Sequence, residues 1–540
     1  MSFRGDAGLS DEDGKLLARP ESLNRNGRRH ELDALRAFAM LLGITLHGAM
    51  AYFPAPWPVQ DPQQSAAFGT FVAAIHGFRM QLFFVLSGFF TAMIWRRRGL
   101  RDLLINRFQR VLIPCLLGLV TIIPLFHWVV MKVTPASNSI RREYRVGDAV
   151  NTPDSQFQVT PLSWASLQGD LQMAQRLVEN GADVNGRNGD GSTPLHSAAF
   201  LGQENLARFL LSKGANPALR DNNGVSPSDS ARADAGTTQF LIGYLRLPAR
   251  SQSDIQAGRD RVLSLLPTNL NQNVATVKKS AGPREAYHAF LTTGPLAVLV
   301  TTNVFDHLWF LWDLCFMVVL FALWPKVRQD RITPSAEWLR RWVLAPRRLV
   351  WLIPLTLIPQ SLMGMSGYVF GPDTATGWLP PPHLLAYYGV FFCFGVLYFE
   401  ADDAIDSLGR RWYLSLPIAL LVVLPAGLAT QPFLRPVSDF LQVMYAWLMI
   451  TGAIGLFRRV LSHENRAIRY VSDASYWMYL IHLPLVVALQ AIILPFPVSA
   501  PVKFSLLMLT SLLLLLISYQ MLVRNTLIGV LLNGRRVPKS

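Results

Sequence analysis

The sequence predicts an all-α protein: a polytopic transmembrane helix bundle of about ten spans, with a helical repeat domain inserted after the third span. Of its 540 residues, 51% are hydrophobic and only 16% are charged, whereas soluble domains carry about a quarter charged residues. Ten apolar stretches reach about the 20 residues that cross a bilayer. A polar segment of about 165 residues separates the third stretch from the fourth, too long for a simple connection, and it repeats itself with a period of 33 residues.

The predicted spans follow the apolar stretches. They cover residues 33–53, 70–95, 111–133, 304–324, 349–370, 383–399, 413–430, 438–457, 474–494 and 502–523. Arg28 and Arg29 precede the first span, whereas the loop after it, residues 53–68, has no Lys or Arg. The positive-inside rule, applied along the chain, therefore predicts a multi-pass protein of the cell (inner) membrane with both termini cytoplasmic and the insert extracytoplasmic.

The net charge of +15 is typical of nucleic-acid-binding proteins only when the cations form one patch. Here they lie in short clusters at the ends of apolar stretches, so they predict topology and contact with the lipid bilayer and no nucleic-acid partner. Cys115, Cys315 and Cys393 all fall inside predicted spans, which argues against a disulfide framework. Neither paired metal-ligand motifs nor a phosphate-binding glycine loop occur, so we expect no metal and no tightly bound cofactor.

The repeat in the insert begins with Thr-Pro-Leu-His at residues 193–196, and matching positions such as Gly181 and Gly214 lie 33 residues apart. This period and this start resemble the ankyrin repeat. Pro194 suits the first turn of a helix, and the two glycines suit its left-handed end. We expect His196 to bond neighbouring backbone groups, and the repeats to offer a surface for a protein partner.

The domain boundaries follow from these patterns and from two polar segments rich in Ser, Gln, Asn, Arg and Pro. The prediction is a disordered cytoplasmic tail (1–27), the first three spans (28–134), a linker (135–157), the repeats (158–245), a second linker (246–285), the remaining spans (286–530) and a short cytoplasmic tail (531–540).

The first span carries two charged or titratable groups whose presence in a membrane has to be explained. Inserting a charged side chain at the bilayer centre costs roughly 2.5–3.5 kcal/mol. Arg36 and His47 are eleven residues apart. That spacing returns within about 20° of the same helix face and rises about 16 Å. Taken alone, Arg36 is equally explained as an anchor whose charge reaches the interface, and His47 as a polar residue bonded to another helix.

A second pair of cations lies at the start of the third span. Arg107 and Arg110 are one helical turn apart, so their guanidinium groups project to neighbouring positions and can fork onto phosphate oxygens. A positive-inside cluster accounts for the arginines of residues 96–98. It accounts less well for Arg110, which begins an apolar stretch.

Together these motifs resemble the membrane-bound acyltransferase 3 family. They are an Arg followed after ten residues by His in the first span, "FFVLSGF" at residues 83–89, and "RFQRVLIP" at residues 107–114 with its Arg-x-x-Arg. "DHLWFLWDL" at residues 306–314 and "DASYWMYLIHLPL" at residues 473–485 look most like the branch that modifies periplasmic glucans. The resemblance covers roughly residues 28–134 and 300–525, and the family's core pattern has no ankyrin-like insert.

The resemblance implies transfer of an acyl group, acetyl or succinyl, from acyl-CoA as co-substrate to a hydroxyl of an envelope or extracytoplasmic saccharide acceptor. Arg36 and His47 match the family's Arg-x10-His motif, and Arg107 and Arg110 match its Arg-x-x-Arg motif. His47 is then the expected general base and Arg36 the residue that positions or polarises the donor. Arg107 and Arg110 are expected to bind the CoA phosphates.

Further polar residues in apolar helices are candidates for an acceptor pocket or for its support; structural hydrogen bonding also explains them, and Asp33 can pair with Arg36 or lie at the interface. They are Asp33, His307, Asp313, Tyr479 and His482. His76 and Arg79 in the second span can serve to pair within the bundle. Two other function classes fit the spans: a membrane transporter or flippase of an acyl donor or lipid, and a membrane-tethered ankyrin scaffold that binds a partner.

Overall fold

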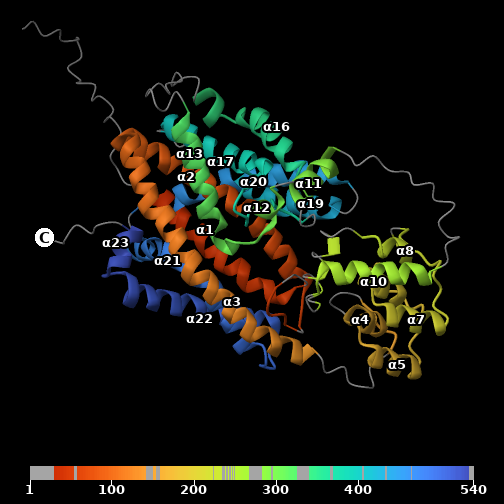
Figure 1. The fold of residues 1–540 in the computed structure, drawn as a ribbon. Coiled ribbons are helices and arrows are strands. Elements are labelled where there is room, and N and C mark those ends of the chain that lie inside the picture. The colour runs from red at the N-terminus through yellow and green to blue at the C-terminus, as the bar shows by residue number, and fades with distance from the viewer. Residues whose placement is uncertain are drawn as a thin grey trace, which may run out of the picture.

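The computed structural model describes most of the chain. It covers residues 29–533 except 54–56, 62, 142–149, 154–158, 223, 234–236, 239–240, 243–244, 246, 248–249, 267–282, 294–295, 325–339, 365–368, 404–406, 432–433 and 464. The described residues form helices and no strand, in a large bundle with a small lobe of short helices beside it (Figure 1). The prediction of an all-α fold is confirmed. The predicted tails, residues 1–27 and the last part of 531–540, lie outside the described residues.

The bundle is built from long helices that follow the apolar stretches. They are α1 (His30–Ala49), α2 (Ala66–Arg107), η2 (Phe108–Leu112), α3 (Ile113–Arg141), η4 (Asp306–Leu308), α13 (Trp309–Leu323), α16 (Arg348–Gln360), α17 (Pro382–Glu400), α18 (Trp412–Ile418), η6 (Ala419–Val423), α19 (Leu424–Thr430), α20 (Arg435–Val460), α21 (Arg466–Ile493), α22 (Ala500–Ser518), η7 (Tyr519–Val523) and α23 (Leu527–Asn533). The last helix takes up the beginning of the segment predicted as a C-terminal tail.

Eight helical segments of the described part are long and apolar enough to cross a membrane. One of them, Ala66–Val133, contains two predicted spans, because the basic segment between them is helical and only kinked at Gly99, where φ is +81°. The predicted span 349–370 is wrong in length. Its helix α16 has 13 residues and ends at Gln360, since Pro359 and then Gly364, with φ at +90°, interrupt the helical bonding.

Helices α2 and α17 pack with their backbones in contact. A Cβ atom added to Gly88 would meet the carbonyl of Phe392, and one added to Gly395 would meet the carbonyl of Val85. Small residues at such a crossing let membrane helices approach closely. The glycine of the "FFVLSGF" motif therefore has a packing role.

Helices α1 and α21 run side by side in the same direction. Near their starts, Ser472 Oγ donates to the carbonyl of Asp33 at 3.1 Å. Near their ends, Gln490 Nε2 donates to the carbonyls of His47 and Gly48, each at 3.1 Å. The two helices are therefore bonded to each other near both of their ends.

Two buried ion pairs stabilise opposite ends of the bundle. Arg458 Nη1 lies 2.7 Å from Asp403 Oδ2 at the end where α1 begins, and Lys503 Nζ lies 2.7 Å from Asp61 Oδ2 at the other end. All four side chains are almost fully buried. Removing one partner would leave an uncompensated buried charge, a change that costs about 3–5 kcal/mol.

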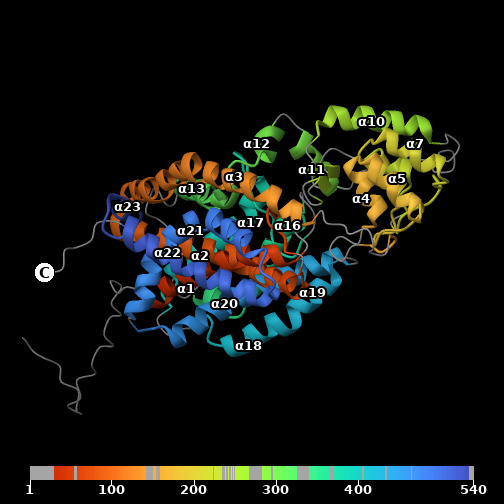
Figure 2. The ribbon, with the colours of Figure 1, turned by 90° about the horizontal axis from the view of Figure 1, so that it is seen from below.

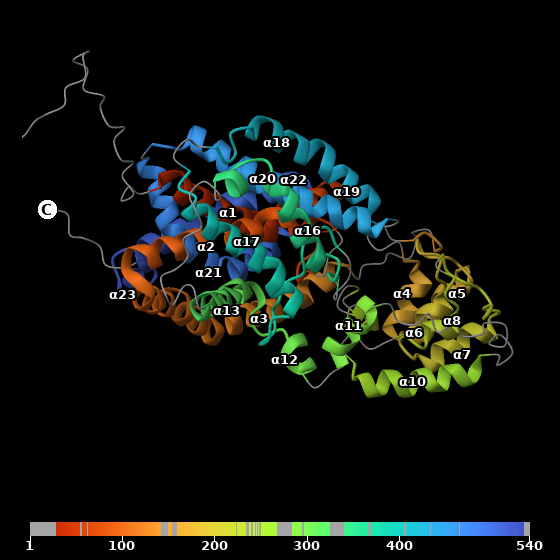
Figure 3. The same ribbon diagram turned by 90° about the horizontal axis from the view of Figure 1, so that it is seen from above.

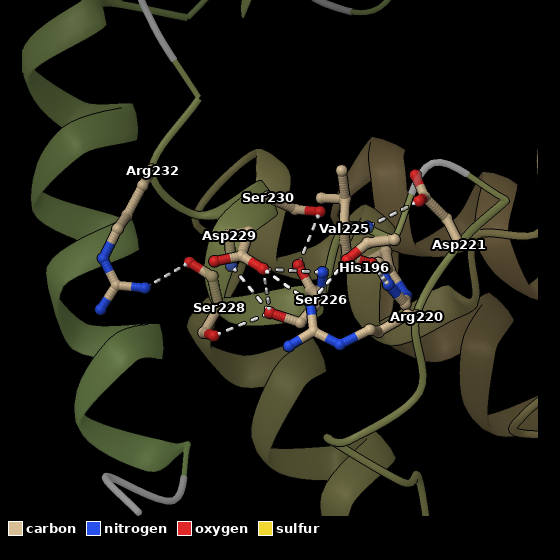
Figure 4. A network of polar contacts seen from close by, with 10 residues as sticks. His196, Arg220, Asp221, Val225, Ser226, Ser228, Asp229, Ser230 and Arg232 are labelled. Atoms are coloured by element: carbon tan, nitrogen blue, oxygen red, sulfur yellow. Dashed lines mark hydrogen bonds and ion pairs between the residues drawn. The ribbon is translucent and has the colours of Figure 1, made fainter. Parts of the chain in front are cut away.

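The small lobe contains the repeats, as helix pairs α4 (Pro161–Gln168) with α5 (Leu171–Glu179) and α6 (Pro194–Phe200) with α7 (Glu204–Ser212), followed by α8 (Pro227–Ser230). Pro194 is at the first helical position, and Gly181 and Gly214 have φ of +88° and +90°, as expected. His196 Nδ1 accepts from Thr193 N at 3.1 Å, and Nε2 lies 3.0 Å from the carbonyl of Val225 (Figure 4). Burial lowers the pKa of His196, so a neutral ring holds the two loops together.

Part of each predicted linker is helical. Helix α3 continues to Arg141, inside the predicted linker 135–157. Helix α10 (Gln252–Leu265), inside the predicted linker 246–285, packs along α7 (Figures 2 and 3). The reason is Arg259, fully buried, whose Nε donates to the carbonyl of Phe200 at 2.8 Å. The helix thus closes the open end of the repeats, as a terminal cap does.

Candidate active site

A cavity of about 530 Å³ lies at the end of the bundle where α1 begins. Its walls come from α1, α2, η2, α13 and α21, with additional side chains from the chain before α1 and from α23. The lining residues are Arg29, Asp33, Arg36, Met40, Phe83, Leu86, Ser87, Phe90, Met93, Ile94, Arg97, Asn106, Arg107, Arg110, Val111, Phe310, Leu311, Leu314, Ser472, Asp473, Tyr476 and Leu532. The cavity combines a charged rim with an apolar interior.

The charge of the cavity is strongly positive, since five arginines and two aspartates line it. Asp33 Oδ1 lies 3.6 Å from Arg36 Nη2, and the guanidinium of Arg36 lies 5.8 Å from the centre of the Phe90 ring. Arg107 Nη2 donates to Thr91 Oγ1 at 2.9 Å. Arg36 and Arg107, which lie far apart in the sequence, thus line one cavity that suits a ligand with several negative charges.

Arg110 reaches the same cavity because of an irregularity in the helix. Residues Phe108–Leu112 form a wider π turn, and the Tyr476 hydroxyl donates to the carbonyl of Arg110 at 2.8 Å. The structure therefore brings Arg36, Arg107 and Arg110 together, while Asp33 partners Arg36.

His47 lies farther along α1, in a cluster of rings rather than in the cavity lining. Its Nδ1 is 2.8 Å from His482 Nε2, and His482 Nδ1 is 2.6 Å from the carbonyl of Tyr479. A carbonyl oxygen only accepts, so His482 Nδ1 carries the hydrogen and its Nε2 is an acceptor. His47 Nδ1 then donates, which leaves His47 Nε2 with the lone pair of a general base.

Two residues that the sequence did not single out hold His47 in this orientation. The Trp57 ring stacks on the His47 ring with centres 5.5 Å apart and planes 9° from parallel. Trp57 Nε1 donates to Gln490 Oε1 at 2.7 Å, and Gln490 also bonds the His47 carbonyl. Trp57 comes from a Pro-rich loop without a motif, so only the folded chain reveals this contact.

His307 and Tyr479 form the rest of the cluster. His307 Nε2 lies 2.9 Å from the carbonyl of Leu480, and the Tyr479 hydroxyl donates to the carbonyl of His307 at 2.6 Å. The His307 ring centre is 5.3 Å from that of His482. These residues support His482 and thereby His47, while Nδ1 of His307 is buried without a hydrogen-bond partner in the described structure.

The remaining candidates make none of the hydrogen bonds given above for this cluster. Asp313 is fully buried, and neither of its carboxyl oxygens has a hydrogen-bond partner among the described residues. The ring of His76 packs against Gly371. In the described part of the chain, no group of three or more His, Cys, Asp or Glu is placed to hold a metal ion.

Comparisons with known proteins agree with this architecture. The family model described as "Acyltransferase domain" matches residues 29–164 and 273–520, and the model for ankyrin repeats (3 copies) matches residues 137–221. The chain is similar to glucans biosynthesis protein C of Escherichia coli (strain K12) and of Escherichia coli O157:H7 (strain EC4115 / EHEC), with 42% identity over 98 residues in each case. That match spans 18% of this chain and 24% of each relative. Because the acyltransferase model covers more than half of the sequence, the chain belongs to the acyltransferase 3 family of membrane proteins and carries ankyrin repeats within its acyltransferase domain.

Proposed function

We propose that the protein is an integral membrane O-acyltransferase that moves an acetyl or succinyl group from acyl-CoA to a hydroxyl of an envelope saccharide or glucan. The observation that carries this proposal is the arrangement along α1, where an arginine-lined cavity at Arg36 is followed by an oriented histidine at His47. The name of the relatives, which refers to glucan biosynthesis, supports the class of acceptor.

The cavity is the proposed site of the donor. CoA carries several phosphate groups, and the excess of arginines over aspartates in the lining favours such an anion. Arg107 and Arg110 bind the phosphates at the rim, and Arg36 positions the donor beside them. The apolar residues of the interior, such as Met40 and Leu314, suit the long uncharged arm of CoA.

His47 is the proposed general base. Its Nε2 takes the proton of the acceptor hydroxyl as the oxygen attacks the thioester carbonyl. The bond from His47 Nδ1 to His482 keeps this lone pair available. Met40 is the cavity residue nearest to His47 along α1, seven residues away. The acyl end of a CoA donor bound in the cavity must therefore extend about 10 Å past Met40 to reach His47.

The proposed membrane sidedness rests on the positive-inside distribution of arginine and lysine. Acyl-CoA would enter from the cytoplasm at the arginine-lined end, where both termini are proposed to lie. The acceptor would approach from the other side of the cell membrane, on which we also place the ankyrin repeats and their protein partner. The reaction would then pass an acyl group through the bundle while CoA stays on the side from which it came.

The test is turnover by purified protein in detergent or nanodiscs with acetyl-CoA or succinyl-CoA and a β-glucan acceptor. We expect release of free CoA that depends on the acceptor, and a matching mass increase of the glucan. His47→Gln should lower the rate about 10²- to 10⁴-fold, whereas His463→Gln, at an exposed position in the connection between α20 and α21, should not. Full activity of His47→Gln would overturn the assignment of the base, and a transporter would release no CoA.

A further inference from the structure

Arg79 lies in the middle of the bundle, where a cation is expensive. It is thirteen residues after the start of α2, which places it about 20 Å along the helix and near the centre of a bilayer. Its side chain is not at the arginine-lined cavity. A guanidinium at this depth is expected to face the bundle interior and to have a partner or a function.

No carboxylate pairs with Arg79 in the described part of the chain. Among the described residues, its Nη2 donates a hydrogen bond to the thioether of Met80 at 3.3 Å, a weak acceptor, and its Nε is buried without a hydrogen-bond partner. Two buried cations of the bundle differ, since Arg458 and Lys503 each lie 2.7 Å from a carboxylate oxygen. The guanidinium of Arg79 therefore retains its full capacity to bind an anion.

The guanidinium of Arg79 also lies close to the proposed base. A Cβ atom added to Gly43 would come within 2.5 Å of Arg79 Nη1, so the guanidinium rests against the backbone of α1 one turn before His47. Arg79 is also near enough to His47, His482 and Tyr479 for its positive charge to act on each of these groups. An acceptor hydroxyl bonded to His47 Nε2 would attack an acyl carbonyl beside it, and that carbonyl would thus have the Arg79 cation as its neighbour.

We propose that Arg79 is a catalytic residue that stabilises the oxyanion formed when the acceptor oxygen adds to the acyl carbonyl. The inference rests on the acyltransferase function proposed above. Stabilisation of a developing charge by a preorganised cation is usually among the largest contributions to acyl transfer, and it is strongest where water is excluded.

The acceptor oxygen loses its proton to His47 Nε2 and forms a bond to the carbonyl carbon, while the electron pair of the C=O bond moves to the carbonyl oxygen beside Arg79. When the C=O bond forms again, the C–S bond breaks and the thiolate of CoA leaves. That thiolate takes the proton from His47 Nε2, so the products are the ester and free CoA.

This role separates Arg79 from the arginines of the cavity. Arg107 and Arg110 hold the donor before and during the reaction, so their loss should mainly raise the KM for acyl-CoA. Arg79 meets a full negative charge only in the tetrahedral state. Its loss should therefore lower kcat and leave KM for the donor nearly unchanged.

The experiment compares three variants of the full-length protein in the CoA-release assay. Arg79→Gln should lower kcat at least about 100-fold, with equal losses for acetyl-CoA and succinyl-CoA and with donor KM changed less than about twofold. Arg79→Lys should restore part of kcat, because the charge returns without the fork geometry. Gly43→Ala keeps Arg79 but displaces its guanidinium, and it should lower kcat about tenfold or more.

Gly389→Ala is the matched control for the glycine variant. It lies on α17 of the same bundle, and its added methyl group would make an ordinary contact with Met317, 3.9 Å from the sulfur. We expect it to keep kcat within about twofold, in contrast to Gly43→Ala. Because Gly43→Ala retains the cation, it tests the proposal even if Arg79→Gln fails to fold.

Three results would overturn the oxyanion role. They are unchanged kcat in Arg79→Gln, a rise in donor KM without a fall in kcat, and a loss confined to succinyl-CoA. The last result would make Arg79 a binding site for the carboxylate of the acyl group. Absence of acceptor-dependent CoA release in the unsubstituted protein would instead overturn the proposed function, and this inference with it.

Discussion

His47 depends on its neighbours for the nitrogen that it presents. The carbonyl of Tyr479 fixes the hydrogen on His482, and His482 in turn makes His47 Nδ1 the donor. If His47 Nε2 takes a proton, the same bond to His482 stabilises the charged ring, because a hydrogen bond from a charged donor is roughly twice as strong as a neutral one. We therefore regard His482 as a positioning residue for the proposed base.

His482 should tolerate replacement only by another acceptor. His482→Leu leaves His47 Nδ1 without a partner, and losing a hydrogen bond to a charged group costs about 1.5–3 kcal/mol, so kcat should fall about 10- to 100-fold. His482→Gln retains an acceptor oxygen and should recover most of kcat. The measurement is kcat for both variants in the CoA-release assay, and equal losses in the two would show that His482 only fills space.

The sequence predicted several of these residues but not their contacts. His47 and His482 were both candidates, yet they are 435 positions apart and meet only because α1 and α21 run parallel. Arg79 was explained equally well by pairing within the bundle, and only the folded chain shows it without a carboxylate among the described residues. A motif thus indicates which side chains belong to a site. The tautomers of its histidines and the hydrogen-bond partners of its cations depend instead on contacts between helices that are far apart in the sequence.

At the scale of elements, α2, η2 and α3 act as one nearly continuous helical segment that carries the arginines into the cavity. The sequence predicted two spans and a basic loop, because the cations of residues 96–98 and 107–110 interrupt the apolar pattern. In the structure the cations stay on a helix whose π turn directs Arg110 to the same cavity as Arg107. Periodicity alone shows no such turn, since it adds a single residue to one turn of the helix.

Arg107→Gln should weaken donor binding. Each charge-assisted hydrogen bond to a phosphate contributes about 1.5–3 kcal/mol, so the KM for acyl-CoA should rise about 10- to 100-fold with a smaller change in kcat. Arg101→Gln is the control, because Arg101 is exposed on α2 and absent from the cavity lining. Steady-state kinetics with acyl-CoA varied at saturating acceptor measures both values. If Arg107→Gln and Arg101→Gln behave alike, Arg107 does not bind the donor.

At the scale of the whole molecule, the described residues form two lobes (Figure 1). The bundle holds the cavity and the histidine cluster, and the ankyrin lobe lies beyond the end of the bundle opposite α23 (Figures 1 and 3). The repeats were predictable because a period of 33 residues is visible without any long-range contact. The cap α10 was not, since its stability depends on Arg259 reaching the carbonyl of Phe200, far away in the sequence.

The proposed sidedness of the reaction requires the repeats and the arginine-lined cavity to face different compartments. Ser212→Cys places a thiol at an exposed position of the repeats, and Ser462→Cys places one at an exposed position just after α20. A membrane-impermeant maleimide applied to intact spheroplasts should label Ser212→Cys at once and Ser462→Cys only after permeabilisation. The unsubstituted protein gives the background from its three free cysteines, which lie in helices of the bundle. The positive-inside distribution of arginine supplies the physical reason for this orientation. Labelling in the reverse order would place the arginine-lined cavity outside the cytoplasm. Acyl-CoA would then have to be exported before it could bind there, so this result would reject the proposed transfer of the acyl group across the membrane.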